Sequence, residues 1–110
     1  MDAKELQSLI DKHLKNENGS FLQKYKFVLH IIRDPQVERW HISRWGSNQR
    51  AITFRFNATK QGLGLLGIEY VVGNDSRGLY VALTDKGRSQ VSEYAKNYTP
   101  VYGYKDRSML

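Results

Sequence analysis

The feature that most constrains the fold is a cluster of turn-forming residues between two apolar runs. The runs Ile68–Val72 and Leu79–Leu83 are rich in valine, isoleucine and tyrosine, which suit the pleated surface of a sheet. The segment between them, Gly73–Gly78, supplies glycine, asparagine and aspartate, which tolerate the positive φ angles of a tight reversal. This pattern predicts a β-hairpin over residues 68–83.

A helix is expected directly after the hairpin. Thr84 is a good N-cap residue, and Asp85 falls in the first turn, where the helix dipole favours a negative charge. Apolar residues then recur at helical spacing: Val91, Tyr94, Ala95 and Tyr98. We therefore predict a helix over Thr84–Asn97.

Two further helices are expected before residue 35. Ala3–Lys15 carries an amphipathic stripe formed by Leu6, Leu9, Ile10, His13 and Leu14. Phe21–Arg33 is apolar enough to be central to the core, with Ser20 as its expected cap. Pro35 should stop it, because a residue before proline avoids the helical region. The width of the first stripe suggests an interface with a second copy.

The segment Val37–Trp45 fits two interpretations. As a helix it would turn Ile42 and Trp45 inward, whereas as a strand its alternation separates apolar from polar side chains poorly. The pattern favours the helix. A turn should follow at residues 46–48, with Ser47 capping the next helix.

Residues 49–61 are the decisive segment, and two structures compete for them. A helix would place Ala51, Phe54, Arg55 and Ala58 on one side and Gln49, Arg50, Thr53, Asn57 and Lys60 on the other, and Gly62 would end it. A strand would alternate cleanly, with Ile52, Phe54, Phe56 and Ala58 on one face. Local alternation favours the strand, but the cap before the segment and the hairpin after it favour the helix.

Charge is distributed unevenly along the 110 residues, whose net charge is +6. No acidic residue lies between positions 39 and 68, and that stretch holds five cations: Arg39, Arg44, Arg50, Arg55 and Lys60. Unopposed cations are the electrostatic footprint of a polyanion-binding surface. A solvated basic face without a ligand would give the same pattern.

Several functions find no support in the composition. The chain has no cysteine, which removes disulfides, thiol catalysis and most structural zinc sites. The three histidines, His13, His30 and His41, fall on different expected elements without metal-ligand spacing, and no catalytic motif is present. We expect no enzyme activity, cofactor or metal. The sequence shows no apolar run of membrane-spanning length and no signal peptide, so we expect a cytoplasmic location. We also expect a single domain over residues 1–98, followed by an extended tail over residues 99–110.

Two stretches resemble a known family. A hairpin with a basic tip that leads through Leu83-Thr84-Asp85-Lys86-Gly87 into a helix is similar to the wing of MarR and PadR winged-helix regulators, and KFVLHIIRDPQ resembles the first helix of such a domain. The resemblance covers about Phe21–Tyr98. It implies a mainly α fold with a small β-hairpin wing, in which Phe21–Arg33, Val37–Trp45 and Ser47–Gln61 are the three helices and residues 68–83 the wing.

The resemblance implies double-stranded DNA binding by a transcriptional regulator. Amide and guanidinium groups of Gln49, Arg50, Thr53 and Asn57 would enter the major groove, where such groups can bond base edges. Ser47, Asn48 and Lys60 would touch the backbone, and Arg77 at the wing tip would reach a phosphate or a minor groove. The helices at both ends resemble the dimer-forming ends of the family and imply a homodimer.

The alternative comes from another class of protein. In this α+β fold, two N-terminal helices would pack on a four-stranded antiparallel meander formed by Trp40–Trp45, Ile52–Ala58, Ile68–Val72 and Leu79–Leu83. Its function would be protein–protein interaction, as a small inhibitor or adaptor whose basic face meets an acidic partner. Whether Ile52–Ala58 is helical separates the two hypotheses.

Overall fold

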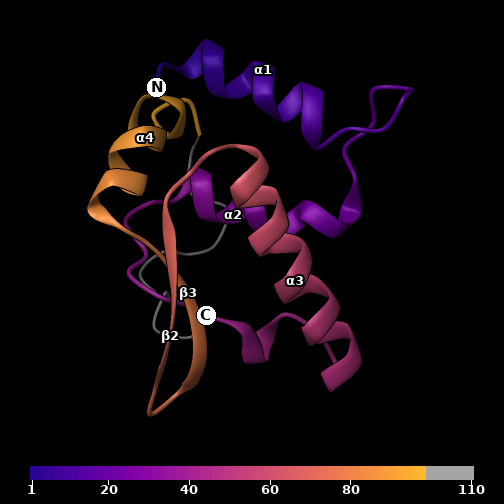
Figure 1. Cartoon of the computed structure of the whole chain (residues 1–110), viewed down its shortest axis with the longest axis vertical. Helices are drawn as coiled ribbons and strands as arrows, with labels where there is room; N and C mark the ends of the chain where they lie inside the picture. The colour runs from indigo at the N-terminus through magenta and orange to yellow at the C-terminus, as the bar shows by residue number, and fades with distance from the viewer. Residues whose placement is uncertain (99–110) are drawn as a thin grey trace.

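A computed structural model describes residues 1–98 of the chain (Figure 1). The tail predicted for residues 99–110 lies outside the described residues. Over residues 1–98 the chain forms a small α+β domain with these elements in order: α1 (Ala3–His13), the 3₁₀ helix η1 (Gln23–Tyr25), α2 (Lys26–Arg33), β1 (Trp40–His41), the 3₁₀ helix η2 (Ile42–Arg44), α3 (Gln49–Leu65), β2 (Tyr70–Asp75), β3 (Gly78–Leu83) and α4 (Asp85–Ala95).

The predicted hairpin is confirmed, and its turn is shorter than the sequence suggested. β2 pairs antiparallel with β3, and Asp75 lies opposite Gly78, so that only Ser76 and Arg77 form the turn. Gly78 has a φ of 104°, a conformation that favours glycine. The polar residues before the turn, which the sequence placed in the loop, therefore belong to β2.

The sheet has a third strand, which the favoured interpretation of the sequence did not include and which only the four-stranded alternative placed in this segment, over Trp40–Trp45. β1 pairs antiparallel with β3, with Trp40 opposite Val81, which gives the strand order β1-β3-β2. The helix expected over Val37–Trp45 is therefore wrong: the segment is a two-residue strand followed by the single turn of η2. Pairing with residues 39 and 41 positions later in the chain overrides the weak local pattern.

Residues 49–61 are helical, so the helix prediction is confirmed and the four-stranded meander is wrong. Asn48, not Ser47, is the N-cap, and its Oδ1 accepts a hydrogen bond from the N–H of Ala51 (2.9 Å). The helix also runs past Gly62 to Leu65, and Gly67, with a φ of 69°, takes the left-handed conformation after it.

Gly62 has a packing role instead of ending the helix. A Cβ atom at this position would lie 2.6 Å from Cγ2 of Val28 and 3.0 Å from Cδ1 of Tyr25. Both neighbours are buried. The missing side chain therefore lets α3 approach α2 and η1 closely, which holds the helix against the core.

The apolar stripe of α1 is buried within the chain itself. Asp2 and Glu5 form a capping box at the start of α1, and the helix ends at His13, two residues earlier than predicted. Leu6, Ile10 and Leu14 are at most 2% exposed, and α1 packs against α4. The width of this stripe therefore gives no reason to expect a second copy.

The second predicted helix begins later than its sequence suggested. Ser20 is not a helix cap; its N–H donates to the side-chain oxygens of Asn16 and Asn18 in the preceding turn. α2 starts only at Lys26, after η1. It is nevertheless central, as expected, because its residues Val28, Ile31 and Ile32 are fully buried.

The cap predicted for the last helix is confirmed, because the Thr84 hydroxyl accepts a hydrogen bond from the N–H of Gly87 (3.0 Å). α4 then ends at Ala95, two residues before the predicted end. Gly87 is buried against the start of the hairpin, where an added Cβ would lie 2.0 Å from the carbonyl oxygen of Glu69. Only a residue without a side chain allows α4 to begin there.

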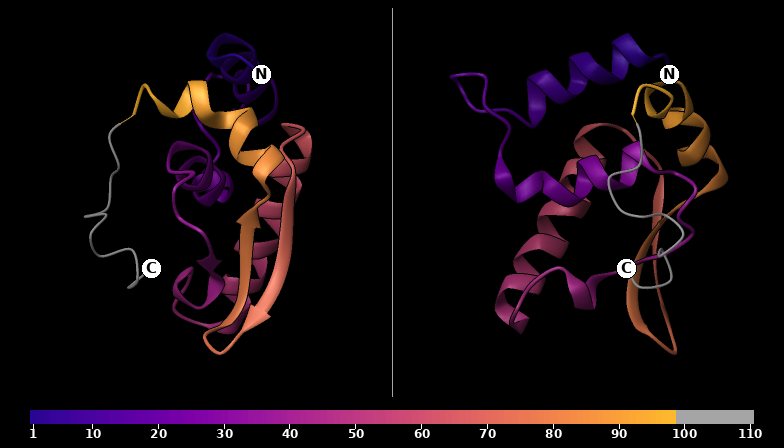
Figure 2. Two further views of the ribbon diagram at one scale, coloured as in Figure 1. Left: turned by 90° about the vertical axis from the view of Figure 1, so that its left-hand side faces the viewer. Right: turned by 180° about the vertical axis from the view of Figure 1, so that it is seen from behind.

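The elements divide the molecule into two ends. α1 and α4 lie together at one end, and the hairpin and the first turn of α3 extend to the other (Figures 1 and 2). The core lies between them, around α2 and the buried ends of α3 and β3. The end away from α1 therefore carries the residues that the sequence singled out.

Candidate functional site

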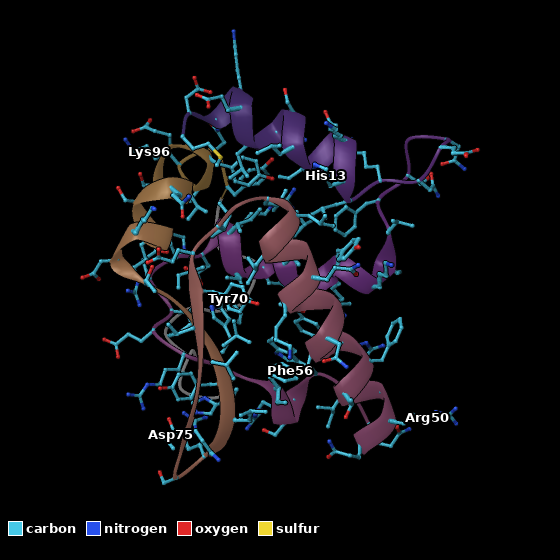
Figure 3. The ribbon with its side chains drawn as sticks, viewed as in Figure 1. His13, Arg50, Phe56, Tyr70, Asp75 and Lys96 are labelled. Carbon is cyan, nitrogen blue, oxygen red and sulfur yellow. The ribbon has the colours of Figure 1, made fainter. Side chains whose placement is uncertain are left out.

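The exposed face of α3 brings several of the predicted site residues together. Arg50, Thr53 and Asn57 are exposed and follow one another at helical spacing. Figure 3 shows the Arg50 side chain pointing away from the ribbon at the start of the helix. Gln49 is also exposed, and its Nε2 donates to Oγ1 of Thr53 (3.1 Å). This part of α3 offers amide, hydroxyl and guanidinium groups to the solvent.

The side of α3 that faces the core differs from the side that the sequence predicted. Phe54, expected on the core side, is 59% exposed. Phe56, expected near the polar face, is half-buried and packs against the core together with Ile52. Arg55 stays near the core because its guanidinium donates to the carbonyl of Trp45, which gives the charged end a partner while its stem is covered.

Lys60 differs from the other predicted contact residues of α3 because its charged end is engaged within the chain. Its Nζ lies 4.2 Å from the centre of the Phe56 ring, a cation–π arrangement, and the residue is only partly exposed. Ser47 and Asn48 lie exposed just before the helix, but the Asn48 carbonyl oxygen is engaged as the cap. Of the Asn48 side chain, the amide NH₂ group is therefore the part left to bind another molecule.

The five cations of the acid-free stretch are not all unopposed. Arg39 pairs with Asp75, Arg55 bonds a carbonyl and Lys60 covers a ring. Within residues 1–98, the side chains of Arg44 and Arg50 have no hydrogen bond or ion pair with another group of the chain. Arg50 is thus the cation of α3 whose charge is available to a partner.

The base of the hairpin turn carries a polar cluster that the sequence did not predict. Asp75 accepts from Nη1 of Arg39 (2.7 Å), lies 2.9 Å from Nε2 of His41, and accepts from the N–H of Arg77 (2.8 Å). Arg39 also lies over the Tyr80 ring, 4.8 Å from its centre. The cluster joins the hairpin to β1 and to the residue before it, over a separation of 34 to 36 residues.

Electrostatics of this cluster favour the ionised carboxylate. Burial alone raises the pKa of Asp75, but the hydrogen bonds from His41, the Arg77 N–H and Arg39 outweigh it and lower the pKa to about 2. Asp75 is therefore ionised at neutral pH and fixes the backbone of Arg77, whose side chain lies at the tip. The hairpin tip and the start of α3 occupy the same end of the molecule, as the labels of Asp75 and Arg50 show in Figure 3.

The histidines of the described residues do not form a metal site. His13, His30 and His41 lie on α1, α2 and β1, and no group of three potential metal ligands gathers in the described part of the chain. Burial, with the charges of Lys26 and Arg33, lowers the pKa of His30 to about 4, which keeps it neutral beside the core. Within residues 1–98, no helix is both long and apolar enough to cross a membrane.

No family model, curated protein or solved structure matches this chain.

Proposed function

We propose that this chain is a winged-helix domain that binds double-stranded DNA as a transcriptional regulator. The order of elements supports the proposal: α2 and α3 are joined through β1 and the single turn of η2, and the β2–β3 hairpin follows α3 directly. In this assignment η2 stands where the second helix of the helix-turn-helix is found, α3 is the recognition helix and the hairpin is the wing.

The observation that carries the proposal is the exposed face of α3. This face combines an unpaired Arg50 with the amides and hydroxyls of Gln49, Thr53 and Asn57, and the sequence around it holds no carboxylate between residues 39 and 68. A helix of about 10–12 Å diameter fits the major groove. There Arg50 would bond a guanine with two hydrogen bonds, and Asn57 an adenine.

Backbone contacts would come from both sides of the recognition helix. Ser47 and the amide group of Asn48 lie at the helix N-terminus, where the dipole attracts a phosphate. Arg77 would reach a phosphate or a minor groove from a wing tip held by Asp75. Lys60 would have to leave the Phe56 ring to touch a phosphate, so we expect its contribution to be smaller than that of Arg50.

The test is fluorescence anisotropy with duplex DNA over a range of salt concentrations. Arg50→Ala should cost about 1–3 kcal/mol at a preferred site and flatten the preference for it, because a bidentate base contact is lost. Lys60→Ala should weaken binding to all duplexes alike and reduce the salt slope by about one unit. Lys12→Ala is the matched control, since it removes an exposed cation from α1 at the other end of the molecule.

Two outcomes would contradict the proposal. Wild-type protein that binds no duplex even at low salt would refute DNA binding and favour the interaction of the basic face with an acidic protein. Equal losses for Arg50→Ala and Lys12→Ala would mean that only total charge matters and that α3 does not read bases.

Dimerisation through the first and last helices stays a prediction from the resemblance. Leu6, Ile10 and Leu14 are covered by the chain itself, so a dimer would have to use other residues of α1 and α4. Sedimentation at high micromolar concentration measures the state directly. A monomer there would leave each domain to bind one half-site independently.

A further inference from the structure

Phe54 is an exposed aromatic side chain on the proposed DNA-reading face. Its ring cannot form the hydrogen bonds to bases that are proposed for the polar residues around it. With 59% of its surface exposed, it is the most exposed large hydrophobic residue in the described part of the chain. It lies one turn after Arg50 and one turn before Asn57, so its ring stands between the two side chains proposed to bond bases.

The surroundings of the ring are polar and basic. Open depressions of about 460 Å³ and about 350 Å³ adjoin Phe54, and Lys24 of η1 lines both of them. Arg50 lines the first depression and Asn57 the second, and neither is lined by an acidic residue. Two copies of the chain facing each other here would bring like charges together, which disfavours a self-association surface.

The exposed Phe54 ring, with Arg50, Asn57 and Lys24 around it, is complementary to a particular kind of ligand surface. That surface has an apolar group between hydrogen-bonding atoms and lies close to phosphates. In the major groove, the 5-methyl group of thymine is such a group: it is the apolar feature of an A·T pair whose adenine presents N6 and N7 to an asparagine or glutamine. Phenylalanine contacts this methyl group by apolar packing.

We propose that Phe54 reads the 5-methyl group of a thymine, and that the preferred duplex carries an A·T pair where the ring enters the major groove. This inference rests on the proposed function and adds the specificity of one base pair to it. Phe54 is a specificity-determining residue, since it discriminates thymine from cytosine and from uracil by contact with the methyl group alone.

The experiment removes that methyl group. A preferred duplex is first enriched from a random pool with wild-type protein, and each of its thymines is then replaced singly by uracil, which differs only by the methyl group. We expect one replacement to weaken wild-type binding about 3- to 10-fold, in keeping with the loss of one buried methyl contact. Phe54→Ala should bind the thymine and uracil duplexes with affinities within about 2-fold of each other.

Leu65→Ala provides the matched control. Leu65 is an exposed hydrophobic residue of the same helix, 39% exposed, that lines neither depression. This variant should keep the full loss of affinity on uracil replacement. Thermal melting by circular dichroism should show all three proteins equally folded.

The outcomes separate failure of the inference from failure of the proposed function. If no duplex is enriched and none binds at low salt, the proposed function fails and the inference fails with it. If duplexes bind but no uracil replacement changes wild-type affinity, or if the loss persists in Phe54→Ala, the inference alone is overturned. Tighter binding to single strands that Phe54→Ala abolishes would assign the ring to base stacking and would also overturn it. The inference would also be overturned if the wild-type protein sedimented as a dimer and Phe54→Ala sedimented as a monomer.

Discussion

The two faces of α3 meet opposite environments, and the phenylalanines Phe54 and Phe56 show this most directly. They are two residues apart, which places them about 200° apart around the helix axis. One ring is 59% exposed, whereas the other is half-buried and packs against the core. One face of the helix therefore stabilises the domain, whereas the other face is exposed to solvent.

Truncation of Phe56 should destabilise the domain more than any other change in this comparison. Phe56→Ala should lower the free energy of unfolding by about 2–3 kcal/mol, less than the roughly 3–5 kcal/mol of a fully buried phenylalanine because the ring is partly exposed. Phe54→Ala should change it by less than about 0.5 kcal/mol. Urea denaturation measures both, and equal losses would mean that the two faces are not distinct.

The glycines of α3 give a second matched pair. Gly62→Ala should lower the free energy of unfolding by about 1–2 kcal/mol, because overpacking against Val28 and Tyr25 exceeds the gain in helix propensity. At Gly64 an added Cβ atom would meet no other atom within 4 Å, so Gly64→Ala should raise the free energy of unfolding by about 0.5–1 kcal/mol. The same urea titrations check the signs, and a stabilising Gly62→Ala would show that α2 and α3 pack less closely than described.

Two threonines sharpen the contrast further. Thr59 is fully buried, and within residues 1–98 its hydroxyl has no hydrogen-bond partner. Thr59→Val should therefore raise the free energy of unfolding by about 1 kcal/mol, since an unsatisfied buried hydroxyl is removed. Thr53→Val, on the exposed face, should stay within about 0.5 kcal/mol of wild type. A destabilised Thr59→Val protein would indicate a bonding partner for that hydroxyl.

Asp75 extends the comparison to a charged group that joins the hairpin to β1. The pKa of Asp75 is about 2 in the folded chain against an ordinary value of 3.8, so its stabilising contribution is complete only above about pH 5 and is lost as the pH falls through 2. Asp75→Asn should be less stable than wild type at pH 7, and the difference should shrink toward zero near pH 2. A difference independent of pH would mean that the ionised carboxylate contributes nothing.

Local signals allowed the sequence to predict the hairpin and the start of α4. The turn residues before Gly78 and the cap at Thr84 act over a few positions, so their effects are visible in the chain itself. The prediction that residues 49–61 are helical also depended on neighbouring signals, namely the cap before the segment and the hairpin after it. The expected mixture of helices and a hairpin is confirmed, although a strand at the position of β1 was expected only in the alternative α+β fold.

Features set by distant partners could not be predicted. A helix with phenylalanine at positions 54 and 56 must expose one ring, and hydrophobicity alone does not decide which. The choice depends on Arg55 reaching the Trp45 carbonyl and on Gly62 fitting against Val28. The Asp75 cluster is similarly hidden, because Arg39 and His41 precede it by 36 and 34 residues.

The contact between Gly87 and the Glu69 carbonyl has a consequence for how this sequence can vary. Because a Cβ atom there would lie 2.0 Å from a backbone oxygen, no side-chain rearrangement can accommodate alanine or any larger residue. A chain that keeps this junction of hairpin and helix must therefore keep glycine at the equivalent of position 87, whereas the residues of the exposed α3 face are not constrained by the junction. Distant relatives of this chain should share that single glycine even where nothing on their surfaces is alike.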